Sequence, residues 1–136
     1  MDDFRQVISL DQLTGDDTVA LARTAAEAIR GLNWTTNCDA GLGQPSVAYD
    51  VTGALSLAAS RLPQLITQIT RWLDHALAAG RLGHDLSQDP APAITAAGTF
   101  LGGARRSAAA LAGDLNQAQQ HLALINGNPR SRKDQP

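Results

Sequence analysis

Apolar residues recur along most of this chain at alternating spacings of three and four residues, which is the periodicity of one face of an α-helix. The pattern is sustained over residues 16–31, 45–80 and 89–126. No stretch alternates apolar and polar residues at period two, as a strand with one buried face would. The pattern therefore predicts a single all-α domain over residues 1–129.

The first predicted helix covers residues 16–31 and follows a polar N-terminal arm at 1–15. Asp16 is expected to be its N-cap, and Gly31 is expected to end it. Asn and Gly residues then predict a loop over 32–44. Trp34 in this loop is expected to cover the end of the bundle, with an exposed anchor as the open alternative.

Two long helices, 45–80 and 89–126, are separated by a polar connector. Pro63 lies inside the first of them, so we expect that helix to be kinked or split near Ser60. The heptad row of helix 45–80 consists of Ala48, Val51, Leu55, Ala58, Leu62, Leu65, Ile69, Trp72, Ala76 and Ala79. The heptad row of helix 89–126 consists of Ile94, Ala97, Leu101, Ala104, Ala108, Leu111, Leu115, Ala118, Leu122 and Ile125.

Folding the chain at the connector brings the two rows together in an antiparallel, coiled-coil-like hairpin. With facing residue numbers adding to 169 or 170, Ile69 faces Leu101, and large residues meet small ones in most other layers, as Leu65 meets Ala104. This alternation packs helices densely. The expected fold is an elongated three- or four-helix bundle built around this hairpin, with a disordered tail at 130–136.

Few charges interrupt the long helices, and apolar residues also lie off the predicted rows. The first helix is too short to cover the hairpin, so we expect a dimer or another protein partner. The open alternative is that Ala, Thr, Ser and Gln tolerate water. Mid-helix glycines point either to a close partner helix, to room for the Trp72 indole, or to a local weakness. The candidate interface residues are Ile66, Leu73, Gly98, Phe100 and Gly102.

The charge balance argues against nucleic acid as a partner, because the net charge is −2 and the pI is about 5.8. Arg105 and Arg106 are the one basic pair on a helix, and they are the candidates for phosphate contact. No segment provides a short recognition helix after a tight turn. A nucleic-acid-associated regulator that uses these arginines and the tail is therefore the alternative function, behind a protein-interaction or accessory role.

The residue types that carry chemistry are few and scattered. Cys38 is the only cysteine and has no histidine nearby in the sequence, so a half-buried structural thiol is expected. His75 and His84 can meet Asp85 at the hairpin tip, but their spacing matches no metal signature. Glu27 is the only Glu, so paired carboxylates are not visible. We therefore predict no catalytic, cofactor or metal site, and a protein that is not an enzyme.

The N-terminus has neither the basic nor the apolar region of a signal peptide, and no apolar run has the length of a membrane span. A cytoplasmic protein is expected, with export by a signal-less route left open.

Short motifs between about Leu32 and Asn126 resemble those of small, Ala- and Arg-rich actinobacterial helical proteins that are often carried by mobile elements. The resemblance implies a helical fold and an actinobacterial host, and it carries no activity with it. The motifs are Arg61-Leu62-Pro63-Gln64-Leu65, Arg71-Trp72-Leu73, Gly80-Arg81-Leu82 and Asp89-Pro90.

Overall fold

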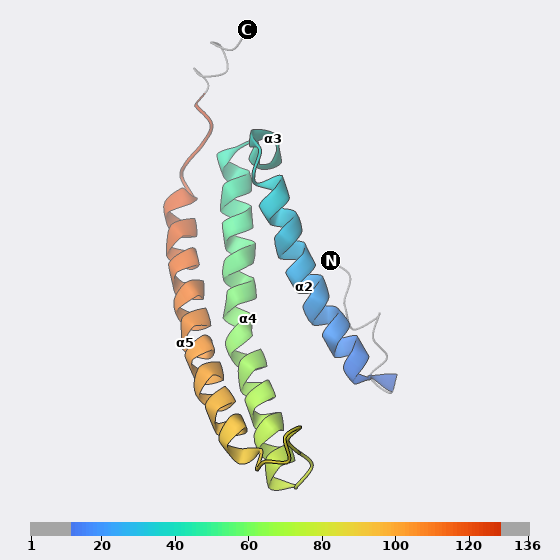
Figure 1. Cartoon of the computed structure of the whole chain (residues 1–136). Helices are drawn as coiled ribbons and strands as arrows, with labels where there is room; N and C mark the ends of the chain where they lie inside the picture. Colours follow the sequence, from blue (N-terminus) through green and yellow to red (C-terminus); the bar gives the residue numbers. More distant parts are fainter. Residues whose placement is uncertain (1–11, 129–136) are drawn as a thin grey trace. The chain divides into compact units, whose positions relative to one another are not determined.

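The computed structural model describes residues 12–128, and within them the chain is helical without any strand (Figure 1). The all-α class is confirmed. The helices are α2 (Gly15–Thr35), α3 (Asp39–Leu42), α4 (Pro45–Ala78) and α5 (Ala91–Leu122). The chain divides into two compact units, residues 1–43 and 44–136. Most of the expected N-terminal arm and the expected disordered tail lie outside the described residues.

Helix α2 begins at Gly15, one residue before the predicted start, because Thr14 and not Asp16 is its N-cap. The Thr14 backbone N–H donates to Asp17 Oδ2 over 3.0 Å, which is half of a capping box. Gly31 does not end the helix, which continues to Thr35. A glycine inside a helix lowers its stability by about 1 kcal/mol relative to alanine, which is too little to end α2 there.

Helix α4 begins with Pro45 in its first turn and runs through Pro63 as one element, so it is not split. A mid-helix proline removes one backbone hydrogen bond, and the packing of the surrounding turns against α5 offsets that loss. Its C-terminus is a Schellman motif: Arg81 N–H donates to the Ala76 carbonyl over 2.9 Å, and Gly80 N–H donates to Leu77 over 3.1 Å. Gly80 adopts the left-handed conformation that this motif requires, with φ of 70°.

Replacing Gly80 with alanine is expected to lower the free energy of unfolding by about 1 kcal/mol, because a β-carbon is disfavoured at positive φ. Gly83→Ala is the matched control, since Gly83 lies in the same connector, has no positive φ and has open space around its α-carbon. Urea unfolding followed by circular dichroism measures both variants. Equal stability of the two would show that the α4 terminus does not depend on the left-handed residue.

Helix α5 begins at Ala91, whose N–H donates to Asp89 Oδ1 over 3.0 Å. Asp89 therefore caps the first turn with its side chain, although Pro90 occupies the N-cap position. The helix ends at Leu122, four residues before the predicted end at Asn126.

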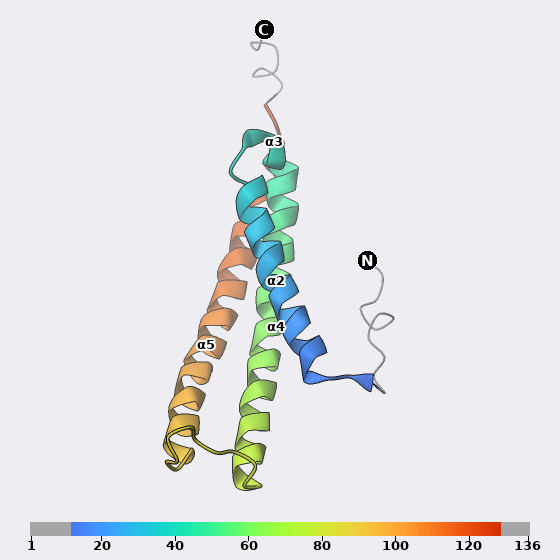
Figure 2. The same cartoon turned by 45° about the vertical axis from the view of Figure 1, so that its right-hand side comes forward.

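Helices α4 and α5 lie side by side and antiparallel in both views (Figures 1 and 2), which confirms the hairpin. Two interhelical hydrogen bonds fix its register. Ser56 Oγ donates to the Ala112 carbonyl over 2.9 Å, and Gln119 Nε2 donates to the Tyr49 carbonyl over 3.5 Å. Facing residue numbers therefore add to 168, within two residues of the predicted register.

The predicted face of α4 is wrong by one residue around the helix in its middle part, where Leu62, Leu65 and Ile69 are exposed. Toward the C-terminus, Ala76 of the predicted row is fully buried. The α4 residues that face α5 form the next heptad row, which we call the inner row of α4. Each of its members is buried or half-buried: Tyr49, Thr52, Ser56, Ala59, Pro63, Ile66, Thr70 and Leu73.

The inner row of α5 matches the prediction at every second position. It consists of Ile94, Gly98, Leu101, Arg105, Ala108, Ala112, Leu115, Gln119 and Leu122, of which only Arg105 is exposed. Gly98, Arg105, Ala112 and Gln119 replace the predicted Ala97, Ala104, Leu111 and Ala118. Small and polar inner residues bring the helices close enough for Ser56 to reach a backbone carbonyl of α5, which a row of Leu, Ile and Trp would prevent.

Candidate functional site

The hairpin has two unlike sides, defined by the residues on either flank of the inner rows. Residues that follow an inner-row residue lie on one side: Thr67, Asp74 and Gly102 line a common groove there. Residues that precede an inner-row residue therefore lie on the other side, since neighbouring residues in a helix are rotated by about 100°. The first side is polar, and the second is apolar.

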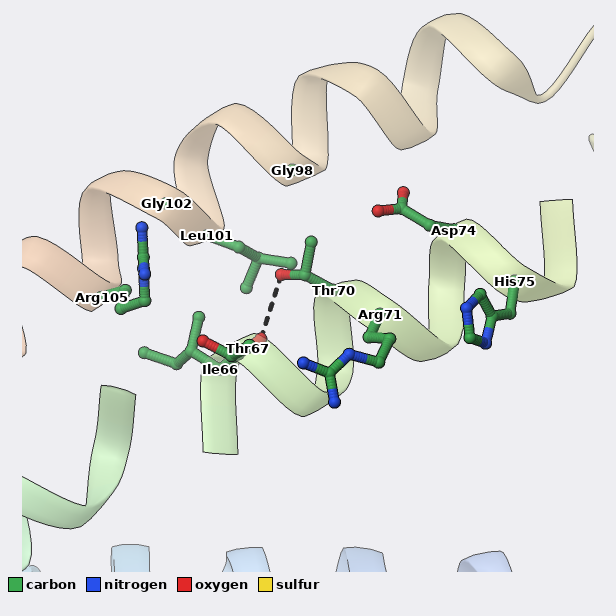
Figure 3. A pocket seen from close by; sticks show the side chains of 10 residues that line it. All are labelled: Ile66, Thr67, Thr70, Arg71, Asp74, His75, Gly98, Leu101, Gly102 and Arg105. Carbon is green, nitrogen blue, oxygen red and sulfur yellow. Dashed lines mark hydrogen bonds between the residues drawn. The ribbon is translucent and has the colours of Figure 1, made fainter. Parts of the chain in front are cut away.

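The groove on the polar side has a volume of about 430 Å³ and separates the middle of α4 from the N-terminal half of α5 (Figure 3). Asp74 and His75 lie at one end, Arg105 lies at the other, and Thr70 and Leu101 lie between them. A β-carbon built on Gly98 would have nothing within 4 Å. Gly98 therefore leaves an opening in the hairpin, without close approach of another helix and without the Trp72 indole.

The groove does not assemble a reactive arrangement from its charged residues. Within the described part of the chain, none of Arg71, Asp74 and Arg105 forms an ion pair. The Arg71 side chain extends away from α5, and Thr70 Oγ1 donates to the Ile66 carbonyl over 3.0 Å (Figure 3). The Thr70 hydroxyl is hydrogen-bonded to its own helix, and the guanidinium groups of Arg71 and Arg105 point in different directions. The groove therefore provides neither an activated nucleophile nor a shared site for an anion.

The apolar side is formed by both helices, and we call it the apolar face. From α4 it has an outer row of residues, of which the exposed large members are 39–55% accessible: Leu62, Leu65, Ile69 and Trp72. Ala48, Val51, Leu55 and Ala58 complete that outer row toward the N-terminus. From α5 it has Ala97, Phe100, Ala104, Leu111 and Ala118, interrupted by the polar residues Ser107 and Asp114. The outer row of α4 corresponds to the predicted heptad row from Ala48 to Trp72, which was expected inside the hairpin.

Trp72 marks the connector end of the apolar face. Its ring lies beneath the Arg81 guanidinium, 5.6 Å from ring centroid to cation, and it remains 55% exposed. A cation over the indole face holds the ring in place at the surface. The expectation that Trp72 lies inside the hairpin, in the heptad row that faces α5, is therefore wrong.

The structure places the five candidate interface residues in two different environments. Ile66 and Leu73 are half-buried in the inner row of α4, and Gly98 and Gly102 are half-buried at the groove. These four belong to the hairpin itself. Phe100 is 79% exposed and is the one candidate that lies on an open surface.

Arg105 and Arg106 are both exposed, and they point to different surroundings. Arg105 lines the groove, whereas Arg106 extends toward Gly102 and Gly103, with Nη1 3.6 Å from the place a β-carbon of Gly102 would take. The basic residues expected to act with them lie in the tail, outside the described residues. Phosphate contact by this pair stays a prediction.

Trp34 and Cys38 differ from their expected environments. Trp34 lies in the last turn of α2, not in a loop, and is 81% exposed. Cys38 is exposed at the N-cap of α3, and its thiol donates to the Thr35 carbonyl over 3.4 Å. No histidine or carboxylate within the described residues joins it in a metal-binding group, and the same holds for His75, His84 and Asp85.

Comparison of the chain with protein families, with curated proteins and with solved structures finds no match in any of the three. The resemblance to actinobacterial helical proteins stays a prediction. In the described part of the chain, no helix combines the length and the hydropathy needed to cross a bilayer.

Proposed function

We propose that this chain is a non-enzymatic helical protein that acts by binding another protein through the apolar face. The observation that supports the proposal is the exposed outer row of α4, in which Leu62, Leu65, Ile69 and Trp72 follow one another at heptad spacing outside the hairpin interface. Single exposed apolar residues are common on proteins, but a contiguous apolar strip that spans several helical turns marks an interaction site.

The thin interior of the hairpin supports the same proposal. Only Ala59, Ala76 and Ala108 are buried among residues 12–128, and all three have one-carbon side chains. Stable domains bury the apolar sides of their helices between two or more layers. The α4–α5 hairpin has one apolar side and one polar side, as a single layer of such a domain does. It therefore resembles one layer whose second layer is supplied by a partner.

Site-specific photo-crosslinking tests the proposal. Benzoylphenylalanine replaces Leu65 on the apolar face or, as the matched control, Thr67 on the groove side two residues away. In living cells the Leu65 position is expected to yield a discrete covalent adduct with a protein, and the Thr67 position is expected to yield none. Absence of an adduct at Leu65, or equal adducts from both positions, would contradict an interaction role for the apolar face.

A further inference from the structure

The apolar face has the dimensions of a complete protein interface. From Ala48 to Trp72 the outer row of α4 extends over about 36 Å at 1.5 Å per residue. Two helices with axes 8–10 Å apart make the face about 20 Å wide, which gives about 700 Å². Standard stable interfaces bury about 800 Å² on each partner, so one partner of equal size and shape suffices to cover the face.

We propose that this partner is a second copy of the chain, related by a two-fold axis that lies between the two apolar faces, at the level of Ser60 in α4 and of Ala108 in α5. The two hairpins then stack apolar face to apolar face as a four-helix bundle, in which α4 lies antiparallel to α4 of the other copy. The inference rests on the proposed function, because it names the partner of the same surface. Its basis is the self-complementary order of residues along the apolar face.

Side-chain sizes along α4 match when the outer row is laid antiparallel on a second copy of itself. With facing residue numbers adding to 120, the register includes all eight residues from Ala48 to Trp72. The largest residue meets one of the smallest at the ends, and every layer is apolar. The pairs are Trp72 with Ala48, Ile69 with Val51, Leu65 with Leu55, and Leu62 with Ala58. A closed two-fold interface requires this kind of self-complementarity.

Helix α5 matches about the same axis. The hairpin register places Ser60 of α4 at the level of Ala108 in α5. Rotation by 180° about the proposed axis brings Ala104 opposite Leu111 of the second copy, and Ala97 opposite Ala118 of the second copy. A single axis therefore keeps every layer of the outer row of α4 apolar and pairs an alanine with Leu111 or with Ala118 in α5. Asp114, which precedes Leu115, is the one acidic residue on this side of α5.

Distances between identical spin labels test both the partner and the axis. Cys38 is first replaced by alanine, since it is the only cysteine, and then Arg61→Cys or His75→Cys provides one label site per chain. Both sites are exposed and occupy the same heptad position. About the proposed axis, the two labels at position 61 are offset by about 3 Å along the helix, and those at position 75 by about 45 Å. Light scattering during size exclusion first establishes that the labelled protein is a dimer.

The expected result is a dimer in which the label separation at position 75 is much longer than at position 61. A dimer with equal separations at both positions would overturn the two-fold arrangement, because parallel α4 helices give every label the same offset. A monomer at every concentration would overturn self-association. If photo-crosslinks from Leu65 then formed with a different protein, the proposed function would stand and this inference would fall.

Leu65→Glu provides the test of the surface itself. Leu65 is already 48% exposed in one chain, so a glutamate is tolerated in the monomer, but two glutamates enter the proposed dimer. Burying unpaired charges on both sides is expected to weaken dimerisation by roughly 100-fold or more. Thr67→Glu on the groove side is the control and is expected to leave the dimer intact. Equal effects of the two substitutions would overturn the assignment of the apolar face as the contact surface.

Discussion

Ala108→Leu is expected to lower the free energy of unfolding by about 2 kcal/mol. Ala108 is 6% exposed and sits in the inner row of α5 at the level of Ala59 and Ser60 in α4. One turn away, Ser56 Oγ reaches the Ala112 carbonyl over 2.9 Å, so the helices are close together here. Three additional carbons at Ala108 force the helices apart, strain the side chains and break that hydrogen bond.

The matched control for Ala108→Leu is the same substitution at Ala109, the next residue of α5, which is exposed. Both variants lose the same small amount of helix propensity and gain the same atoms, so their difference reports packing alone. Urea unfolding followed at 222 nm gives the free energies. Should Ala108→Leu prove as stable as Ala109→Leu, the close contact between α4 and α5 at this level would be refuted.

Gly41→Ala is expected to disrupt the corner between α2 and α3. A β-carbon on Gly41 would overlap the backbone carbonyl oxygen of Thr35, and a backbone atom cannot move aside as a flexible side chain can. The corner must open, and the hydrogen bond from Gly41 N–H to the Cys38 carbonyl, 3.1 Å long in the structure, is lost with it. The loss is local, because opening residues 36–43 limits the free energy that the substitution can remove.

Amide hydrogen exchange and heteronuclear NMR measure this local effect. Exchange at Gly41 and Gly43, whose N–H groups donate to the Cys38 and Asp39 carbonyls, is expected to accelerate at least tenfold, while resonances of α4 and α5 stay in place. Gly31→Ala is the control, since Gly31 lies inside α2 with open space around it and gains helix propensity. Unchanged exchange in Gly41→Ala would mean that the corner has a different backbone path.

Heptad spacing and terminal signals were sufficient to predict the hairpin. The polar connector lies between the two long helices, as the sequence predicts. The interhelical register is within two residues of the prediction, because the connector length and the rise per residue determine it together. The boundaries of α2 were less accurate, since Thr14 competes with Asp16 as an N-cap and both are suitable residues.

The exposure of the apolar face was not predicted, because hydrophobicity alone does not determine which row of α4 faces α5. The row with Leu62, Leu65, Ile69 and Trp72 is the more apolar, so it was assigned to the interior. The neighbouring row is equally regular in the sequence, and its N-terminal half contains the small residues Thr52, Ser56 and Ala59. Close helix pairs favour small side chains, and applying that criterion would have directed the large residues outward.

The position of the interhelical bonds along the hairpin also determines the order in which it can fold. Thr70 and Gly98, near the connector, are joined by a short stretch of chain, whereas the Ser56–Ala112 and Tyr49–Gln119 bonds close loops of 56 and 70 residues. The entropy of loop closure rises with length, so pairing should nucleate beside the connector and proceed as a zipper toward Tyr49. Substitutions near Gly80 should then change the folding rate, and those near Gln119 mainly the unfolding rate.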